Sequence, residues 1–150
     1  IKGVCDIGIH SAKDLPEPLP SSLEIIALTK GVDPADVLVL RKKESLESLP
    51  IQACIGTSSL KRMEKVKQLR ADLVAKDIRG TIDQRLDQLE QGLYDGVIMA
   101  KAALIRLKLI RNTETLPGKP APMQGRIAVV AREEDLEMKE LFACLNVSCT

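Results

Sequence analysis

Short apolar runs alternate with amphipathic stretches along most of this chain. Apolar runs of strand length occupy residues 4–10, 23–29, 36–41, 53–55, 73–78, 97–100 and 126–131. Apolar residues at helical spacing follow the later runs, at about 60–69, 82–89, 101–110 and 134–146. Strands that alternate with helices in this way are typical of an α/β fold, and we expect a largely parallel sheet.

Two segments that contain proline and glycine divide this pattern into parts. Gly31 and Pro34 separate the second apolar run from the third, and the loop 116–125 precedes the last one. We expect both segments to cross between two lobes. We therefore predict a partial first lobe at 1–32, a complete small α/β domain at 33–122 and a return to the first lobe at 123–150. Because the chain starts at Ile1, we also expect a fragment of a longer protein.

The composition narrows the classes of partner. The 150 residues include 22 Lys and Arg against 21 Asp and Glu, so the net charge is +1, which argues against broad electrostatic capture of nucleic acid or membrane. Tyr94 and Phe142 are the only aromatic residues, which leaves little for base stacking. No run approaches the length of a transmembrane helix and no signal peptide precedes the first strand, so we expect a cytoplasmic protein.

Several common catalytic and metal-binding patterns do not occur. Four cysteines without a C-x-x-C pair, beside a single histidine, predict no metal site; they are Cys5, Cys54, Cys144 and Cys149. Three of them lie in apolar surroundings, which predicts buried free thiols. His10 and Ser11 point to opposite faces of an extended chain and do not suit a Ser–His–Asp triad. The glycine-rich nucleotide-binding loops are also missing from the sequence.

The stretch C-I-G-T-S-S-L-K-R at 54–62 predicts an anion site. Gly56 permits a tight turn after a short strand, and Ser58 or Ser59 is a suitable N-cap for the helix that follows. The free N–H groups of a helix start and its dipole attract anions, and Lys61 and Arg62 add positive charge. The alternative is an ordinary capped surface helix.

Two further junctions carry polar or cationic residues. The loop after the first strand is closed by prolines and contains Ser11, Lys13 and Asp14. Arg79 and Arg85 flank another strand–glycine–helix junction at Gly80. Cations that converge at strand ends suit a ligand with several carboxylates or phosphates, although solvated loops are the alternative. Asp14 would either pair with a cation or handle positive charge or a proton during a reaction.

Four motifs resemble, in order and spacing, the porphobilinogen deaminase (hydroxymethylbilane synthase) family. They are H-S-A-K-D-L-P at 10–16, I-G-T-S-S-L-K-R at 55–62, I-R-G at 78–80 with an arginine five residues later, and P-A-P-M-Q-G at 120–125. The resemblance covers essentially the whole chain. It implies a two-lobed fold like that of periplasmic binding proteins. It also implies a transferase of tetrapyrrole and haem biosynthesis that joins four porphobilinogen units into hydroxymethylbilane, releases ammonia, and builds on a covalent dipyrromethane cofactor.

The resemblance also implies roles for single residues. Asp14 would be the catalytic carboxylate that contacts pyrrole nitrogens and stabilises the cationic azafulvene formed as ammonia leaves. The cofactor would be held by Ser11, Lys13, Asp14, Thr57, Ser58, Ser59, Lys61 and Arg62. The substrate site would contain Arg79, Gly80, Arg85 and Gln124.

Some features depart from the family pattern. Lys61 stands where arginine is usual, Thr81 replaces an asparagine and Met123 replaces a glycine. The family's N-terminal segment and its third domain, which bears the cofactor-linking cysteine, lie outside this sequence. We therefore expect the chain alone to be an inactive fragment. Family members are monomers, but exposed strand edges would favour association of the fragment. The alternative function is a non-catalytic, small-anion-binding domain of solute-binding-protein type, which would have no need of Asp14.

Overall fold

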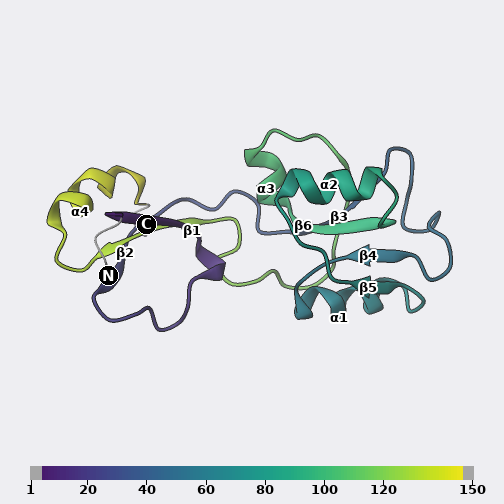
Figure 1. Cartoon of the computed structure of the whole chain (residues 1–150), viewed down its shortest axis with the longest axis horizontal. Coiled ribbons are helices and arrows are strands. Elements are labelled where there is room, and N and C mark those ends of the chain that lie inside the picture. The colour runs from purple at the N-terminus through teal and green to yellow at the C-terminus, as the bar shows by residue number, and fades with distance from the viewer. Residues whose placement is uncertain (1–4, 147–150) are drawn as a thin grey trace. The chain divides into compact units, whose positions relative to one another are not determined.

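The computed structural model describes residues 5–146 and divides into two compact units. Unit 1 consists of Ile1–Pro34 and Ala121–Thr150, and unit 2 consists of Ala35–Pro120 (Figure 1). The chain therefore passes from one unit to the other twice, after Pro34 and after Pro120.

Unit 2 is built on a five-stranded mixed sheet in the order β5-β4-β6-β3-β7. The strands are β3 (Asp36–Leu40), β4 (Cys54–Gly56), β5 (Val74–Lys76), β6 (Gly96–Ala100) and β7 (Asn112–Thr115). β4 runs parallel to β5 and β6, whereas β3 runs antiparallel to β6 and β7. The predicted α/β fold is confirmed, but the sheet is only partly parallel. No helix connects β3 to β4, so no crossover imposes a parallel direction on β3.

Helices cover both faces of this sheet. Side chains alternate between the faces along each strand, so successive residues of one strand join different cores. Helices α2 (Ile82–Glu90) and α3 (Lys101–Arg106) pack on the face formed by Val37, Val39, Val97 and Met99. Helix α1 (Leu60–Leu69) packs on the other face, with Val66 against Leu38, Ile55 and Ile98 (Figure 1).

The ends of α2 follow from local sequence. Thr81 caps its start in a capping box: the Thr81 hydroxyl accepts from the Gln84 N–H and the Gln84 side chain accepts from the Thr81 N–H. Gly92, with φ of 75°, ends the helix in the left-handed conformation that favours glycine. Within residues 5–146 no helix has the length and apolar character needed to cross a membrane.

Unit 1 contains a three-stranded antiparallel sheet in the order β1-β8-β2. Its strands are β1 (Ile7–Ser11), β2 (Leu23–Leu28) and β8 (Ile127–Arg132). The central strand β8 comes from the C-terminal flank and thus joins the two flanks into one sheet. Helix α4 (Leu136–Phe142) packs on this sheet through Met138 and Phe142, and the short helices η1 (Ala12–Asp14) and η2 (Ala143–Leu145) complete the unit.

The expectation of three buried thiols is wrong. Cys5 and Cys144 are exposed and Cys54 is half-buried, while Cys149 lies outside the described residues. Cys5 precedes an edge strand and Cys144 lies in the last helical turn of the described chain, so few neighbours cover either thiol. Partial burial raises the pKa of the Cys54 thiol. Among residues 5–146, no three His, Cys, Asp or Glu side chains gather as metal ligands would.

An ion pair closes the loop before β5. The Arg70 guanidinium donates to both carboxylate oxygens of Asp72, with Nε–Oδ1 and Nη2–Oδ2 distances of 2.7 and 2.8 Å. The backbone N–H of Gln52 donates to Oδ2 of the same carboxylate at 3.0 Å. These hydrogen bonds, the one from Arg70 above all, lower the pKa of Asp72 from 3.8 to about 2.

This pair gives the fold a defined acid sensitivity. Because the folded-state pKa lies below the unfolded value, the stabilisation is complete above the unfolded pKa of 3.8 and is lost as the pH falls to about 2. We expect Asp72→Asn to lower the free energy of unfolding at pH 7 and to flatten its pH dependence in this range, as measured by urea unfolding. The control Asp87→Asn, at an exposed position of α2, should keep the wild-type slope. An unchanged slope in Asp72→Asn would contradict this account.

Candidate functional site

The C-terminal ends of the parallel strands lie at one edge of the unit 2 sheet, here called the carboxyl edge. β4 ends there at Gly56, β5 at Lys76 and β6 at Ala100. The antiparallel register places Asp36, the first residue of β3, opposite Ala100 and therefore at the same edge. The junctions after β4 and β5, which carry two of the predicted motifs, both leave the sheet from this edge.

Hydroxyl groups tie the two junctions together. The Thr57 N–H donates to the Lys76 carbonyl at 2.9 Å, and the Ser58 hydroxyl donates to the Ile78 carbonyl. Thr57 is buried, and its Oγ1 accepts from the Ser59 N–H at 3.4 Å. The predicted residues of the first motif are thus held beside those of the second.

The helix start after β4 differs from the prediction in one respect. Ser59 occupies the N-cap position of α1, but its side chain makes no capping hydrogen bond. The Ser58 hydroxyl contacts the second junction instead, and the Thr57 hydroxyl accepts from the Ser59 N–H. Within the described part of the chain, the N–H groups of residues 60–62 therefore meet no acceptor and are available to an anion.

The two cations of the first motif have different surroundings. Lys61 is exposed, whereas Arg62 is half-buried and donates from Nε and Nη2 to Oδ1 of Asp36, at 3.1 and 2.6 Å. Lys65 contacts Oδ2 of the same carboxylate at 3.4 Å. Asp36 was missed in the sequence because it begins an apolar run. An acidic residue at the first position of a fully buried strand is the pattern that would have identified Asp36 as a candidate.

The second junction presents two more cations. Arg79 is largely exposed and donates from Nε to Oδ2 of Asp77 at 3.0 Å, which is the main reason that the pKa of Asp77 is lowered. Arg85 donates from Nε to the Gly80 carbonyl at 2.9 Å. Gly80 has φ of 113°, and a Cβ there would lie 2.6 Å from Oε1 of Gln84, so glycine is required.

The remaining predicted residues belong to unit 1. Ser11 ends β1, and Lys13 and Asp14 lie in η1, with Asp14 exposed. Lys13 donates from Nζ to Oε1 of Gln124 at 3.4 Å, and the buried Gln124 donates from Nε2 to the Pro34 carbonyl at 2.5 Å. The structure therefore brings Lys13 and Gln124 together within unit 1.

The backbone at Met123 has a conformation that favours glycine. Its φ is 59°, in the left-handed region that glycine enters without a Cβ clash. The neighbouring Gly125 has φ of 85°, and a Cβ there would lie 3.1 Å from the Asp33 carbonyl oxygen. Of the left-handed positions in the loop before β8, Gly118, Met123 and Gly125, only Met123 is not glycine.

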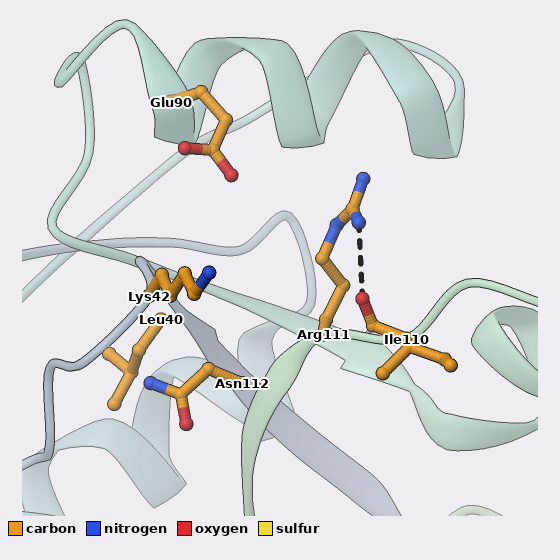
Figure 2. Close-up of a pocket in the computed structure, with 6 residues that line it drawn as sticks. All are labelled: Leu40, Lys42, Glu90, Ile110, Arg111 and Asn112. Atoms are coloured by element: carbon orange, nitrogen blue, oxygen red, sulfur yellow. Dashed lines mark hydrogen bonds between the residues drawn. The ribbon is translucent and has the colours of Figure 1, made fainter.

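A separate cavity lies away from these groups. It has a volume of about 440 Å³ and is lined by Leu40, Lys42, Glu90, Ile110, Arg111 and Asn112 (Figure 2). Leu40 ends β3 opposite Gly96, the first residue of β6, so the cavity lies at the other edge of the sheet from Thr57. Figure 2 shows the hydrogen bond that the Arg111 guanidinium donates to the Ile110 carbonyl. The Nη1–O distance is 3.1 Å. None of the predicted site residues lines this cavity.

Most of the chain matches a protein-family model. Residues 1–140 match the family model described as "Porphobilinogen deaminase, dipyromethane cofactor binding domain". The chain is 44% identical over 149 residues to a probable porphobilinogen deaminase of Picrophilus torridus, covering 97% of this chain and 52% of that protein. For a probable porphobilinogen deaminase of Chlamydia pneumoniae the identity is 45% over 146 residues, with 97% and 62% covered. The chain therefore spans about half to two thirds of these relatives' length.

Solved structures show the same fold at low identity. An ancestral cationic amino acid solute-binding protein has a TM-score of 0.56 at 12% identity, covering 90% of this chain and 59% of its own. A substrate-binding protein of an amino acid ABC transporter from Streptococcus pneumoniae, bound to L-arginine, has a TM-score of 0.53 at 16% identity, covering 95% and 61%. The periplasmic-binding-protein-like fold is thus confirmed, and these likenesses carry no information about the ligand of this chain.

The left-handed backbone at Met123 can be tested by two substitutions. Met123→Gly and Met123→Ala both remove the side-chain atoms beyond Cβ, but only glycine adopts the observed φ without strain. We expect Met123→Gly to exceed Met123→Ala in free energy of unfolding by about 1 kcal/mol, as measured by urea denaturation. Equal stability of the two variants, or a more stable Met123→Ala, would show that this φ imposes no strain.

Proposed function

The chain belongs to the porphobilinogen deaminase family. We propose that it forms part of a transferase that joins porphobilinogen units into hydroxymethylbilane and releases ammonia. The observation that supports this most is the collection of hydroxyls, helix N–H groups and cations at the carboxyl edge of unit 2. Each porphobilinogen ring carries an acetate and a propionate group. A growing chain of such rings is a multiply anionic ligand of the kind that these groups bind.

The donor groups at the first junction fit the carboxylates of dipyrromethane. Lys61, Arg62 and the N–H groups of residues 60–62 supply only donors, and Thr57, Ser58 and Ser59 add hydroxyls. These residues would hold cofactor carboxylates in unit 2, and the family resemblance assigns the same role to Ser11, Lys13 and Asp14 of unit 1. When bound, dipyrromethane supplies the pyrrole end to which porphobilinogen units are joined. Lysine at position 61 provides charge without the two parallel hydrogen bonds that arginine would offer.

We assign Arg79, Gly80 and Arg85 to the substrate site. The Arg79–Asp77 pair is exposed, and exposed ion pairs contribute little to stability. A substrate carboxylate can therefore replace Asp77 on Arg79 at small cost. Gly80 leaves room for the backbone turn that carries Arg79, and its carbonyl orients Arg85. Gln124 takes part through its contact with Lys13.

Asp14 is proposed as the catalytic carboxylate. It is exposed in η1, and the helix is fixed to β8 by the hydrogen bond from the Ala12 N–H to the Arg126 carbonyl, at 3.1 Å. Pro16 restricts the chain just after it. A carboxylate held in this way stabilises the positive charge that develops on the substrate when the carbon–nitrogen bond breaks and ammonia leaves.

The proposed function also implies a partner, a cellular location and an oligomeric state. Porphobilinogen is its small-molecule partner, and the near-neutral net charge gives no support to a role for nucleic acid or membrane surfaces. We place the protein in the cytoplasm as a monomer. A non-catalytic domain that binds small anions would share the carboxyl edge but would have no use for Asp14.

The role of Asp14 can be tested in the full-length protein. We expect Asp14→Asn to reduce bilane formation from porphobilinogen by about 100-fold or more, while the affinity for a pyrrole that carries acetate and propionate but no aminomethyl group changes little. Glu17→Gln removes an exposed carboxylate three residues further on and should keep wild-type turnover. Wild-type turnover in Asp14→Asn would refute the assignment. Binding without any turnover in the wild-type protein would favour the anion-binding alternative.

A further inference from the structure

The guanidinium of Arg62 has two sides that can each bind a carboxylate through two N–H groups. Asp36 occupies one of them: Nε and Nη2 both donate to its Oδ1, at 3.1 and 2.6 Å. The other side, formed by Nη1 and the second hydrogen of Nη2, has no acceptor among the described residues. Arg62 is therefore anchored through one side and can accept a ligand through the other.

The contact with Asp36 is well shielded from water. The Asp36 side chain is 5% exposed and that of Arg62 is 13% exposed. Hydrogen bonds between charged groups are stronger in such surroundings than at the surface, so the guanidinium is held in one orientation. Asp36 is itself fixed, because its backbone carbonyl accepts from the Leu116 N–H at 2.9 Å and its strand lies inside the sheet.

Asp36 also compensates the positive charge at the start of α1. Lys61, Arg62 and Lys65 follow the start of α1, where the helix dipole disfavours cations, and no acidic residue lies in its first turn. Lys65 contacts Oδ2 of Asp36 at 3.4 Å and also donates to the Lys119 carbonyl at 3.2 Å. Arg62 and Lys65 thus contact different oxygens of one buried carboxylate.

We propose that Asp36 is a positioning residue of the anion site. It holds Arg62 by the Nε side and presents the Nη1–Nη2 side to a carboxylate of the pyrrole ligand. This inference rests on the proposed function, in which Arg62 binds such a carboxylate. The orientation follows from the antiparallel register of β3, which places Asp36 at the carboxyl edge.

A double-mutant cycle separates positioning from a general effect on stability. The probe is a pyrrole that carries acetate and propionate but no aminomethyl group, and its Kd for the full-length protein is measured by calorimetry. We expect Asp36→Asn and Arg62→Lys each to weaken binding by roughly tenfold, the size of one charged hydrogen bond. The double variant should bind no more weakly than Arg62→Lys alone, because Asp36 acts only through Arg62. The control Lys65→Met, which removes another cation that contacts Asp36, should bind the probe as the wild type does.

A second readout reports the orientation without any ligand. In ¹⁵N NMR of the arginine side chains, the Nε–Hε signal of Arg62 should move in Asp36→Asn and stay in place in Lys65→Met. If Asp36→Asn does not fold, Asp36→Glu takes its place, since the longer side chain keeps the charge but displaces the guanidinium. In that variant we expect weaker binding and a shifted Nε–Hε signal.

The outcomes distinguish this inference from the function on which it rests. Probe binding that is weakened by Arg62→Lys but unaffected by the Asp36 variants overturns only the positioning role. Losses that add in the double variant also overturn it, because they show that Asp36 acts independently of Arg62. A wild-type protein that fails to bind the probe, or that binds it equally well after Arg62→Lys, refutes the proposed carboxylate site and the positioning role together.

Discussion

The antiparallel register of β3 against β6 is the constraint on which the anion site depends. It places the first residue of β3 beside the last residues of the parallel strands, and so brings the carboxylate of Asp36 to an edge that otherwise carries donors. With that carboxylate in place, Arg62 is held in a fixed orientation close to the start of α1. A parallel β3 would carry Asp36 to the opposite edge of the sheet, and α1 would begin with uncompensated positive charge.

The fold and the ligand are determined by different parts of the sequence. The alternation of valine, leucine and isoleucine along β3 and β6 builds two cores and is compatible with many functions. In the proposed function, the junction residues after β4 and β5 bind the ligand. The carboxyl edge carries the cations Lys61, Arg62, Arg79 and Arg85. Family membership and this charge pattern both support the proposed carboxylated ligand.

The sequence predicted the elements whose cause is local. The order of strands and helices and the two strand–glycine–helix junctions follow from periodicity and turn residues. β7 was missed because N-T-E-T is polar and becomes a strand only through pairing with β3. The Asp36–Arg62 contact joins residues 26 positions apart, and no local pattern indicates it. The exposure of Cys5 likewise depends on which strands lie at the sheet edge.

The most direct test of the anion site is an NMR titration of the full-length, ¹⁵N-labelled protein with a pyrrole that carries acetate and propionate but no aminomethyl group. The amide signals of Thr57, Arg62, Gly80 and Arg85 should shift in a saturable way, while those of Leu40, Ile110 and Asn112, which line the cavity at the opposite sheet edge, should stay in place. Saturable shifts confined to the cavity residues, or no shifts at the carboxyl edge, would contradict the account.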